Sequence, residues 1–408
     1  MRNPINIDKL QARPYQLKNT IQHYEWGKRN DQALIANLLG LKPEHDKPYA
    51  ELWIGSHPKG PSQLIDPDEG IIELVEWISE NQEVRLGYLE TAQTPPGLPY
   101  LFKVLSAAES LSIQAHPNKQ QAKQLHEDDP YHYPDDNHKP EIAIAIDSLD
   151  ALVGFISQTD YTALLDTLPP LNELLNNSRT ATPNLKQDVM ILLRLWDAKP
   201  EAIKICLALI HKQFSSKEHS SEQETLFLAQ SDIHGQDDIG LLFLLLLNRV
   251  HLGPGEAIFL PPGVPHAYLH GNIIECMANS DNVVRLGLTK KFCDAKALSN
   301  ILNFGDTIDY SVNTQQSDGI KKYLTPTQEF SVQSLNLEDE ESKIFTENTS
   351  LVLFLVLEGE VSVNWCTEEE SCSYIFRRGA SFIVPANLTT FNMQSRSKTN
   401  LYFVNIPK

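Results

Sequence analysis

The stretch GEAIFLPPGVPHAY, from Gly255 to Tyr268, constrains the fold of this chain more than any other. A glycine that permits a tight turn precedes a short apolar run, and a proline–glycine corner follows it. Because proline cannot donate to a sheet ladder, the corner ends the strand just before His266. The pattern predicts a strand, a corner and a returning strand that begins at the histidine. Such a corner aims the imidazole into the mouth of a β-barrel, where a metal ion could bind.

A second copy of this pattern lies near the C-terminus and lacks the histidine. The stretch GASFIVPANLTT, Gly379 to Thr390, has the same spacing, with threonine at the histidine position. Upstream, Leu351–Leu357 and Gly359–Val363 are predicted to be two strands around a tight turn. The spacing of the first copy, glycine-x5-proline-x-glycine-x2-histidine, resembles a signature of the cupin superfamily. Two copies predict two β-barrel modules, one with a metal site and one without.

The balance of charge restricts the partners of the chain. With 408 residues and a formal charge of −19, the chain is long enough for two or three domains and is strongly acidic. Nucleic acid requires a basic face, so a nucleic-acid partner is not expected. An anionic small molecule would have to be met by a local cluster of lysine and arginine. A monomer or a weak homo-oligomer is expected.

The cysteines and the apolar runs indicate a cytoplasmic protein without a membrane segment. The five cysteines form no CxxC pair, and the N-terminus has no apolar signal core. The most apolar run, Ile239–Leu247, is too short to cross a bilayer. Because it follows Asp237 and Asp238, which favour helix N-termini, a buried helix is predicted there.

The periodicity of apolar residues changes twice along the chain. From about 15 to 155 the apolar runs are short and separated by turns, which is typical of strands. From about 158 to 248 the spacing becomes helical, as in Leu185, Val189, Leu192 and Trp196, with a break at Lys199-Pro200. The fold class predicted is mainly β with a helical insertion: two cupin-like β-barrel or jelly-roll modules plus an α-helical domain. The metal-binding module comprises 1–157 and 249–320, the helical insertion 158–248, and the metal-free module 321–408.

Four donor side chains are predicted to meet at the mouth of the first barrel. In the stretch LSIQAHP, alternation along a strand puts Gln114 and His116 on one face. Glu141 opens an apolar strand, so its carboxylate needs a compensating partner there. Together with His266 these side chains offer two oxygens and two nitrogens, a set suited to one Zn²⁺ per chain. Each has an ordinary alternative, since a lone histidine is more often a hydrogen-bonding residue and Glu141 could simply pair with Lys139.

Several further stretches give the chain a specific resemblance. In order along the chain, from about residue 17 to 295, it closely resembles type I mannose-6-phosphate isomerases; the C-terminal module matches only in general character. The matching stretches are QHYEWG (22–27), ELWIGSHP (51–58), YLFKVL (100–105), LSIQAHP with Lys119 (111–119), HKPE (138–141), PHAY (265–268), ECMA (275–278) and SDNVVR (280–285).

The resemblance implies an activity and a site. It implies zinc bound by Gln114, His116, Glu141 and His266, and an essential arginine at Arg285. It implies that the chain interconverts mannose 6-phosphate and fructose 6-phosphate, moving a proton between C1 and C2 through a cis-enediolate. Many relatives have Thr-Pro-Lys where this chain has Thr289-Lys290-Lys291, which leaves only the local turn in doubt.

Such a reaction needs a base, a stabiliser of negative charge and a grip on the phosphate. Glu275 is predicted to be the proton-shuttling base, returned to the mouth by a turn at Gly271-Asn272. Arg285 stays protonated, so charge stabilisation and help with ring opening are expected of it. Lys139 is expected to hold Glu141 ionised or to orient a substrate hydroxyl, and His57 to act as an acid or base in ring opening.

Candidates for contact with the rest of the substrate are fewer. Ser112 shares the inward face with Gln114 and His116, and Lys103 stands in an otherwise apolar strand, although snorkelling would also explain it. Lys291 is a third candidate for the phosphate. Trp26 is equally expected to line the sugar site or to pack in the core.

Two other classes of protein fit part of the pattern. A zinc cupin that binds sugar phosphates without turnover would have the same donors. An oxidative Fe²⁺ cupin usually has a histidine-rich triad with open coordination positions, whereas this chain offers glutamine and glutamate beside only two histidines.

Overall fold

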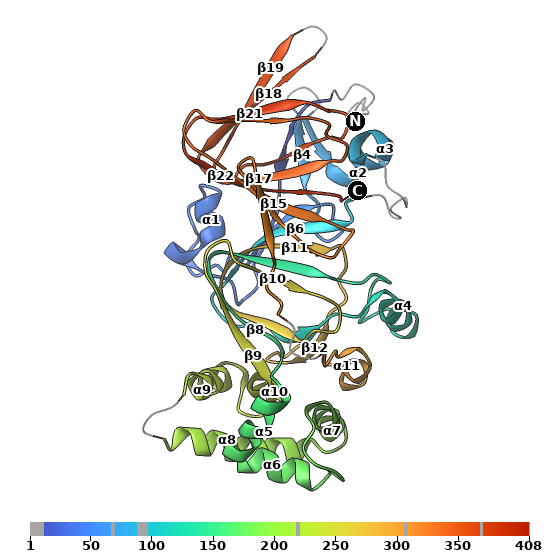
Figure 1. Cartoon of the computed structure of the whole chain (residues 1–408), viewed down its shortest axis with the longest axis vertical. Helices are drawn as coiled ribbons and strands as arrows, with labels where there is room; N and C mark the ends of the chain where they lie inside the picture. The colour runs from blue at the N-terminus through green and yellow to red at the C-terminus, as the bar shows by residue number, and fades with distance from the viewer. Residues whose placement is uncertain are drawn as a thin grey trace.

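The molecule is elongated, with three regions stacked along its long axis. Figure 1 shows the C-terminal strands at one end, the strands that carry the predicted metal ligands in the middle, and a group of helices at the other end. The computed structural model describes residues 12–66, 70–87, 97–217, 221–305, 309–367 and 370–407.

The middle region is an antiparallel sheet in the order β10-β8-β11-β6-β3-β2, with β9 paired to β8, and β7 linking β11 to β12. Strands from both sides of the helical region interleave in it: β10 and β11 flank β8. The chain therefore returns after the helices to complete one sheet, as the change of periodicity predicts. The strands are β2 (Thr20–Gln22), β3 (Glu51–Gly55), β6 (Tyr100–Ala107), β7 (Ile113–Ala115), β8 (Glu141–Phe155), β9 (Leu247–Leu252), β10 (Ala257–Leu260), β11 (His266–Ala278) and β12 (Val284–Gly287).

The inserted helices pack their apolar stripes into one core with residues of β7, β8, β11 and β12. Helix α7 begins after Asn184, whose side chain accepts from the N–H of Gln187, and ends at Ala198; after Lys199, Pro200 begins the next helix. Every residue of α10 is buried, as expected for the most apolar run. The helices are α5 (Gln158–Thr167), α6 (Pro169–Asn176), α7 (Leu185–Ala198), α8 (Pro200–Ser215), α9 (Glu222–His234) and α10 (Gly240–Leu246).

The C-terminal module contains two sheets packed face to face. A four-stranded sheet has the order β16-β21-β18-β19, and a nine-stranded sheet has the order β13-β14-β15-β22-β17-β20-β1-β4-β5. Phe354 stacks on Phe382 and Phe403 in the core between them. The C-terminal strands are β13 (Thr314–Ser317), β14 (Ile320–Tyr323), β15 (Ser331–Leu337), β16 (Ser342–Phe345), β17 (Val352–Glu358), β18 (Glu360–Cys366), β19 (Ser371–Arg377), β20 (Ser381–Val384), β21 (Phe391–Ser395) and β22 (Thr399–Asn405).

Strands from the N-terminal part of the chain join this C-terminal sheet. Strand β1 (Tyr15–Lys18) pairs with β20, with Tyr15 opposite Ile383, and β4 (Gln63–Asp66) and β5 (Gly70–Glu73) continue the sheet beyond it. The sheet thus crosses the predicted boundary near residue 320, while the division of the chain into domains stays a prediction. The remaining helices are α1 (Leu34–Leu38), α2 (Leu74–Glu80), α3 (Gln82–Leu86), α4 (Lys119–Asp128) and α11 (Ala295–Ile301).

The structure differs from the sequence-based prediction at two turns. The strands predicted on either side of Gly359 exist as β17 and β18, but they are not paired: they belong to different sheets. The turn predicted at Gly271-Asn272 is wrong, because β11 runs through these residues without reversing. The pairing of β11 with β8 instead shifts register between Tyr268 and His270 and again between Gly271 and Ile273. Gly271 is required there because a Cβ would lie 2.1 Å from the carbonyl oxygen of Ser148.

The predicted fold class, mainly β with an inserted helical region and a cupin-like C-terminal module, is confirmed. Within the described residues, the helices are all too short or too polar to span a membrane.

The helical insertion contacts the end of β12 through two glycines. A Cβ on Gly240, at the start of α10, would lie 2.4 Å from the backbone nitrogen of Leu288 and 2.8 Å from the carbonyl carbon of Gly287. Asp238, just before the helix, accepts from the N–H groups of Gly240 and Leu288. The insertion is thereby fixed against the strand that carries Arg285.

We expect Gly240→Ala to destabilise the protein by about 1–3 kcal/mol, because the added methyl group would clash with backbone that is held on both sides. Gly253→Ala is the matched control, since its Cβ would meet only the side chain of Glu256 at 3.5 Å. Denaturant unfolding of the two variants measures the difference, and equal midpoints would contradict the close contact.

Candidate metal centre and active site

Three predicted ligands reach one point from three places in the sequence. His116 follows β7, Glu141 opens β8, and His266 opens β11 directly after the proline–glycine corner. The corner also fixes His116, because the N–H of Gly263 donates to the His116 carbonyl oxygen at 2.8 Å. Gly263 has φ +82° and a Cβ there would lie 2.5 Å from the Ile301 carbonyl oxygen, so only glycine fits.

The geometry of these three side chains fits a divalent metal ion. Nδ1 of His116 donates to the Asn282 carbonyl oxygen and Nδ1 of His266 to that of Val264, so in the neutral form of each imidazole Nε2 carries the lone pair. Both Nε2 atoms point at Oε2 of Glu141, at 3.5 Å from His116 and 3.3 Å from His266. All three atoms are buried, and none of them has a hydrogen-bond partner among the described residues. Donors about 2.1 Å from a tetrahedral zinc ion are about 3.4 Å apart, which these distances match.

The environment of Glu141 and His116 favours the protonation states that a metal ligand requires. Burial alone would raise the pKa of Glu141, but Lys139 and the two histidines lower it well below its usual value. Lys139 Nζ lies 2.8 Å from Oε1 of Glu141, the oxygen that does not face the histidines. Burial lowers the pKa of His116 to about 4. Near neutral pH the site therefore presents one carboxylate and a neutral imidazole, as a zinc ligand set requires.

Gln114 lies directly opposite His266 in the β7–β11 ladder and opposite Arg285 in the β7–β12 ladder. Directly opposed residues project from the same face, so Gln114 is placed beside the three buried donors. Ser112, two residues earlier on the same face, donates to Oε1 of Gln114 at 3.4 Å. The predicted alternation of the strand therefore holds, with Ile113 and Ala115 in the core on the other side.

A second buried cluster lies on the neighbouring strands. Nζ of Lys103 is 2.9 Å from Glu275 and 3.5 Å from Glu51, which also accepts from the indole N–H of Trp53. Burial alone would lower the pKa of Lys103, but Glu275 and Glu51 raise it above its usual value. Burial raises the pKa of Glu275, with Glu141 adding to the rise and Lys103 opposing it. Glu275 is thus a buried carboxylate beside the metal centre.

His57 is buried and pairs with Asp281. Its Nε2 lies 3.3 Å from Oδ1 of Asp281, whose other oxygen is 2.8 Å from Lys59 Nζ. Burial alone would raise the pKa of Asp281, but His57 and Lys59 hold it below its usual range. The ring of His57 packs edge-on against Trp53 at 4.8 Å, which connects it to the Lys103 cluster.

Arg285 and Lys291 are the cations without a carboxylate partner near this site. Neither lies within ion-pair distance of a carboxylate in the part of the chain that the structure describes. Burial lowers the pKa of both, and Arg285 lowers that of Lys291 further. Lys291 Nζ lies 5.6 Å above the ring of Tyr24, which stacks on Trp26 at 5.7 Å. Arg285, Lys291 and the two aromatic rings thus form one group of cationic and aromatic side chains.

Comparisons with known proteins agree with this geometry. A family model described as phosphomannose isomerase type I, catalytic domain, matches residues 15–158, and one described as mannose-6-phosphate isomerase, cupin domain, matches residues 319–402. Mannose-6-phosphate isomerase of Rattus norvegicus is 36% identical over 377 residues, covering 84% of this chain and 87% of the relative. Mannose-6-phosphate isomerase 1 of Arabidopsis thaliana is 34% identical and covers 95% and 92%.

This chain belongs to the type I mannose-6-phosphate isomerase family.

Solved structures support the assignment to this family. A mutant of phosphomannose isomerase from Salmonella typhimurium matches with a TM-score of 0.85 and 28% identity, over 96% of this chain and 99% of the other. A zinc-bound mannose 6-phosphate isomerase matches with a TM-score of 0.84 and 29% identity, over 97% and 100%. The predicted resemblance, the predicted enzyme class and the prediction of zinc as cofactor are confirmed.

Sequence reasoning left three residues of the site unassigned. Tyr268 shares the face of His266, and its hydroxyl is buried close to Glu275. Burial and the charges of Glu275 and Glu141 raise its pKa well above the usual value. Glu51 opens an apolar strand just as Glu141 does, a signal that could have identified it. Asp281 has no comparable signal, because its pairing with His57 joins distant parts of the chain.

We expect His266→Ala to weaken zinc binding by at least about 100-fold, because it removes one of the convergent donors. His270→Ala is the control, since His270 lies in the same strand but is exposed. Competition with a chromophoric chelator measures both affinities. Unchanged zinc affinity in His266→Ala would place the metal elsewhere.

Proposed function

We propose that this chain interconverts mannose 6-phosphate and fructose 6-phosphate by moving a proton between C1 and C2 of the open sugar through a cis-enediolate. The observation that carries the proposal is the position of Glu275, a buried carboxylate with a raised pKa, beside the three convergent donors His116, Glu141 and His266. A base and a cation site in one buried place are what an aldose–ketose isomerisation requires.

His116, Glu141 and His266 would hold zinc, with Gln114 as the fourth ligand. Bound zinc supplies a Lewis acid that polarises sugar oxygens and favours negative charge on them. Lys139 keeps Glu141 ionised through its contact with Oε1, so the ligand set carries the charge that zinc requires.

Glu275 is assigned the proton transfer. Its burial raises the pKa toward the value at which a carboxylate is an effective base near neutral pH. Lys103 limits that rise and fixes the direction of the carboxylate through its 2.9 Å contact. Since Lys103 is buried and already matched by Glu275 and Glu51, we assign it to positioning Glu275 rather than to the phosphate.

Arg285 is assigned the stabilisation of negative charge during proton transfer. It lies opposite Gln114 on β12 and has no carboxylate to neutralise it among the described residues. Ring opening requires a proton donor and acceptor near the sugar. His57 is assigned this role, with Asp281 fixing the orientation of its imidazole.

The phosphate is assigned to Lys291 and Ser112. Lys291 lies close enough to Arg285 for each charge to act on the other, and a dianionic phosphate would relieve that repulsion. Ser112 offers a hydroxyl two residues from Gln114 on the inward face. Trp26, stacked on Tyr24, would cover the sugar next to Lys291.

We place the enzyme in the cytoplasm as a monomer or weak homo-oligomer acting on a small sugar phosphate. All five cysteines are free thiols, which is typical of a reducing compartment. Sedimentation of the purified protein measures the oligomeric state.

The alternative that the sequence leaves open is a zinc cupin that binds sugar phosphates without converting them. The buried Glu275 argues against it, because binding alone gives no reason to bury a carboxylate beside a metal centre. A coupled assay for fructose 6-phosphate, with and without chelator, separates the two functions. Metal analysis of protein purified without added ions tests for an iron enzyme.

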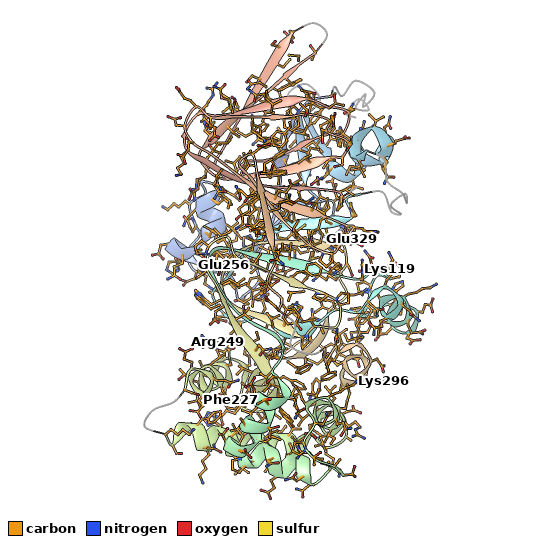
Figure 2. The ribbon with its side chains drawn as sticks, viewed as in Figure 1. Lys119, Phe227, Arg249, Glu256, Lys296 and Glu329 are labelled. Atoms are coloured by element: carbon orange, nitrogen blue, oxygen red, sulfur yellow. The ribbon has the colours of Figure 1, made fainter. Side chains whose placement is uncertain are left out.

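We expect Glu275→Gln to lower kcat by about 10²–10⁴-fold, the contribution of a positioned general base. It should also abolish exchange of the C1/C2 proton with solvent deuterium, measured by NMR on mannose 6-phosphate. Glu256→Gln is the control: Figure 2 labels Glu256 on the side of the molecule away from Lys119 and Lys296, and its side chain is exposed. Full turnover and exchange in Glu275→Gln would remove it from the base role.

We expect Lys291→Met to raise KM for mannose 6-phosphate about tenfold with kcat within about twofold, because it removes a contact made equally in the ground and transition states. Lys290→Met, the adjacent and exposed lysine, should leave both constants unchanged. Steady-state kinetics decide, and a fall in kcat alone would place Lys291 in the chemistry instead.

A further inference from the structure

A segment of the C-terminal module contacts the loop that leads into Glu141. Oε1 of Glu329 lies 2.6 Å from Nε2 of His138, and the two side chains are only 21% and 24% exposed. The hydroxyl of Thr327 donates to the other carboxylate oxygen of Glu329. Figure 2 labels Glu329 between the C-terminal strands and the level of Lys119, the first residue of α4.

The carboxylate of Glu329 is charged in the folded protein. Burial alone would raise its pKa, but His138 and Thr327 lower it to about 2. The contact is therefore a charge-assisted hydrogen bond, which is shorter and stronger than a neutral one.

The same loop is fixed on its other side by the metal centre. Nδ2 of Asn282 donates to the carbonyl oxygens of Asp135 and Asn137, at 2.7 and 2.9 Å. The carbonyl oxygen of Asn282 in turn accepts from Nδ1 of His116 at 2.8 Å. The loop 135–140 thus lies between a metal-site histidine and Glu329.

The residue that follows His138 acts directly on the metal centre. Lys139 Nζ lies 2.8 Å from Oε1 of Glu141, and the carbonyl oxygen of Pro140 accepts from the N–H of Ala278. A shift of His138 would therefore move Lys139 and, through it, the carboxylate that faces both histidines.

A second contact from the same part of the module reaches the other ligand-bearing segment. Nζ of Lys321 and the hydroxyl of Tyr323 both donate to the carbonyl oxygen of Gly255, at 2.7 and 3.2 Å. Gly255 begins the turn, strand and corner that end at His266. Residues 321–329 thus hold both of the chain segments that deliver Glu141 and His266.

We propose that the C-terminal module positions the metal centre, and that Glu329 is a positioning residue acting through His138 and Lys139 on Glu141. The inference rests on the proposed function for its kinetic readout but not for its metal readout. The proposal gives the metal-free module a role. The module contacts the two segments that carry Glu141 and His266, whereas the metal ligands all lie in the metal-binding module. A purely structural contact would affect stability and leave zinc affinity and kcat unchanged.

The test compares Glu329→Ala and Glu329→Gln with Glu360→Gln. Glu360 is the matched control, because it belongs to the same module and is ion-paired at 2.7 Å, with Arg377. We expect Glu329→Ala to weaken zinc affinity and to lower kcat about tenfold, the smaller end of the range for outer partners of metal ligands, with KM within about twofold. Glu329→Gln, which can still accept from His138, should recover most of the loss, and Glu360→Gln should match the unmodified chain.

A double-mutant cycle shows whether Glu329 acts through His138. Adding Glu329→Ala to His138→Gln should cost little more than His138→Gln alone, whereas independent effects would multiply. The proposal is overturned if Glu329→Ala changes only the unfolding midpoint, or if the two losses multiply. If the unmodified chain has no isomerase activity, the proposed function fails while the zinc affinities still decide this inference.

Discussion

The site depends on three donor atoms, two imidazole nitrogens and one carboxylate oxygen, that converge in a buried place. The backbone carbonyls of Asn282 and Val264 accept from Nδ1 of His116 and His266, so the neutral form of each imidazole turns the lone pair of Nε2 toward Glu141. Without a cation this arrangement is repulsive and leaves three polar atoms desolvated. The surrounding backbone holds these groups in the arrangement that a bound divalent ion would stabilise.

The pairing of the cations divides the lysines and arginines of the site into two kinds. Lys139 and Lys103 are buried against carboxylates, Glu141 for the first and Glu275 with Glu51 for the second. Removing one partner of such a buried ion pair lowers the stability of the folded protein by several kcal/mol. We therefore expect these two lysines to orient their carboxylates rather than to bind substrate. Arg285 and Lys291 have no carboxylate partner among the described residues, so both can bind an anion. In a chain of net charge −19, two unmatched cations beside a metal centre define where a sugar phosphate can be held.

Sequence reasoning reached the features whose signals are local. Alternation placed Gln114 beside His116, and the proline–glycine corner located His266, because a two-residue period and a missing donor act on neighbouring residues. Pairings between distant segments left no such signal: nothing around Tyr15 indicates that β1 joins β20, and nothing around Asp281 indicates that it meets His57. The position of Lys103 in an apolar strand indicates that its charge needs a partner, but only the structure shows that the partners are Glu275 and Glu51. Its local sequence is equally compatible with snorkelling.

The wrong turn at Gly271-Asn272 has a physical explanation that bears on the whole site. His266 and Glu275 are nine residues apart, an odd spacing that a regular strand would place on opposite faces. Between Tyr268 and His270, β11 advances two residues while β8 advances one, from Ala151 to Asp150. Such a bulge reverses the alternation, so Glu275 returns to the face of His266 and lies opposite Lys103 and Ala143. Gly271 follows this bulge and forms no turn, and the one extra residue in β11 brings the proposed base and a metal ligand onto the same side of one continuous strand.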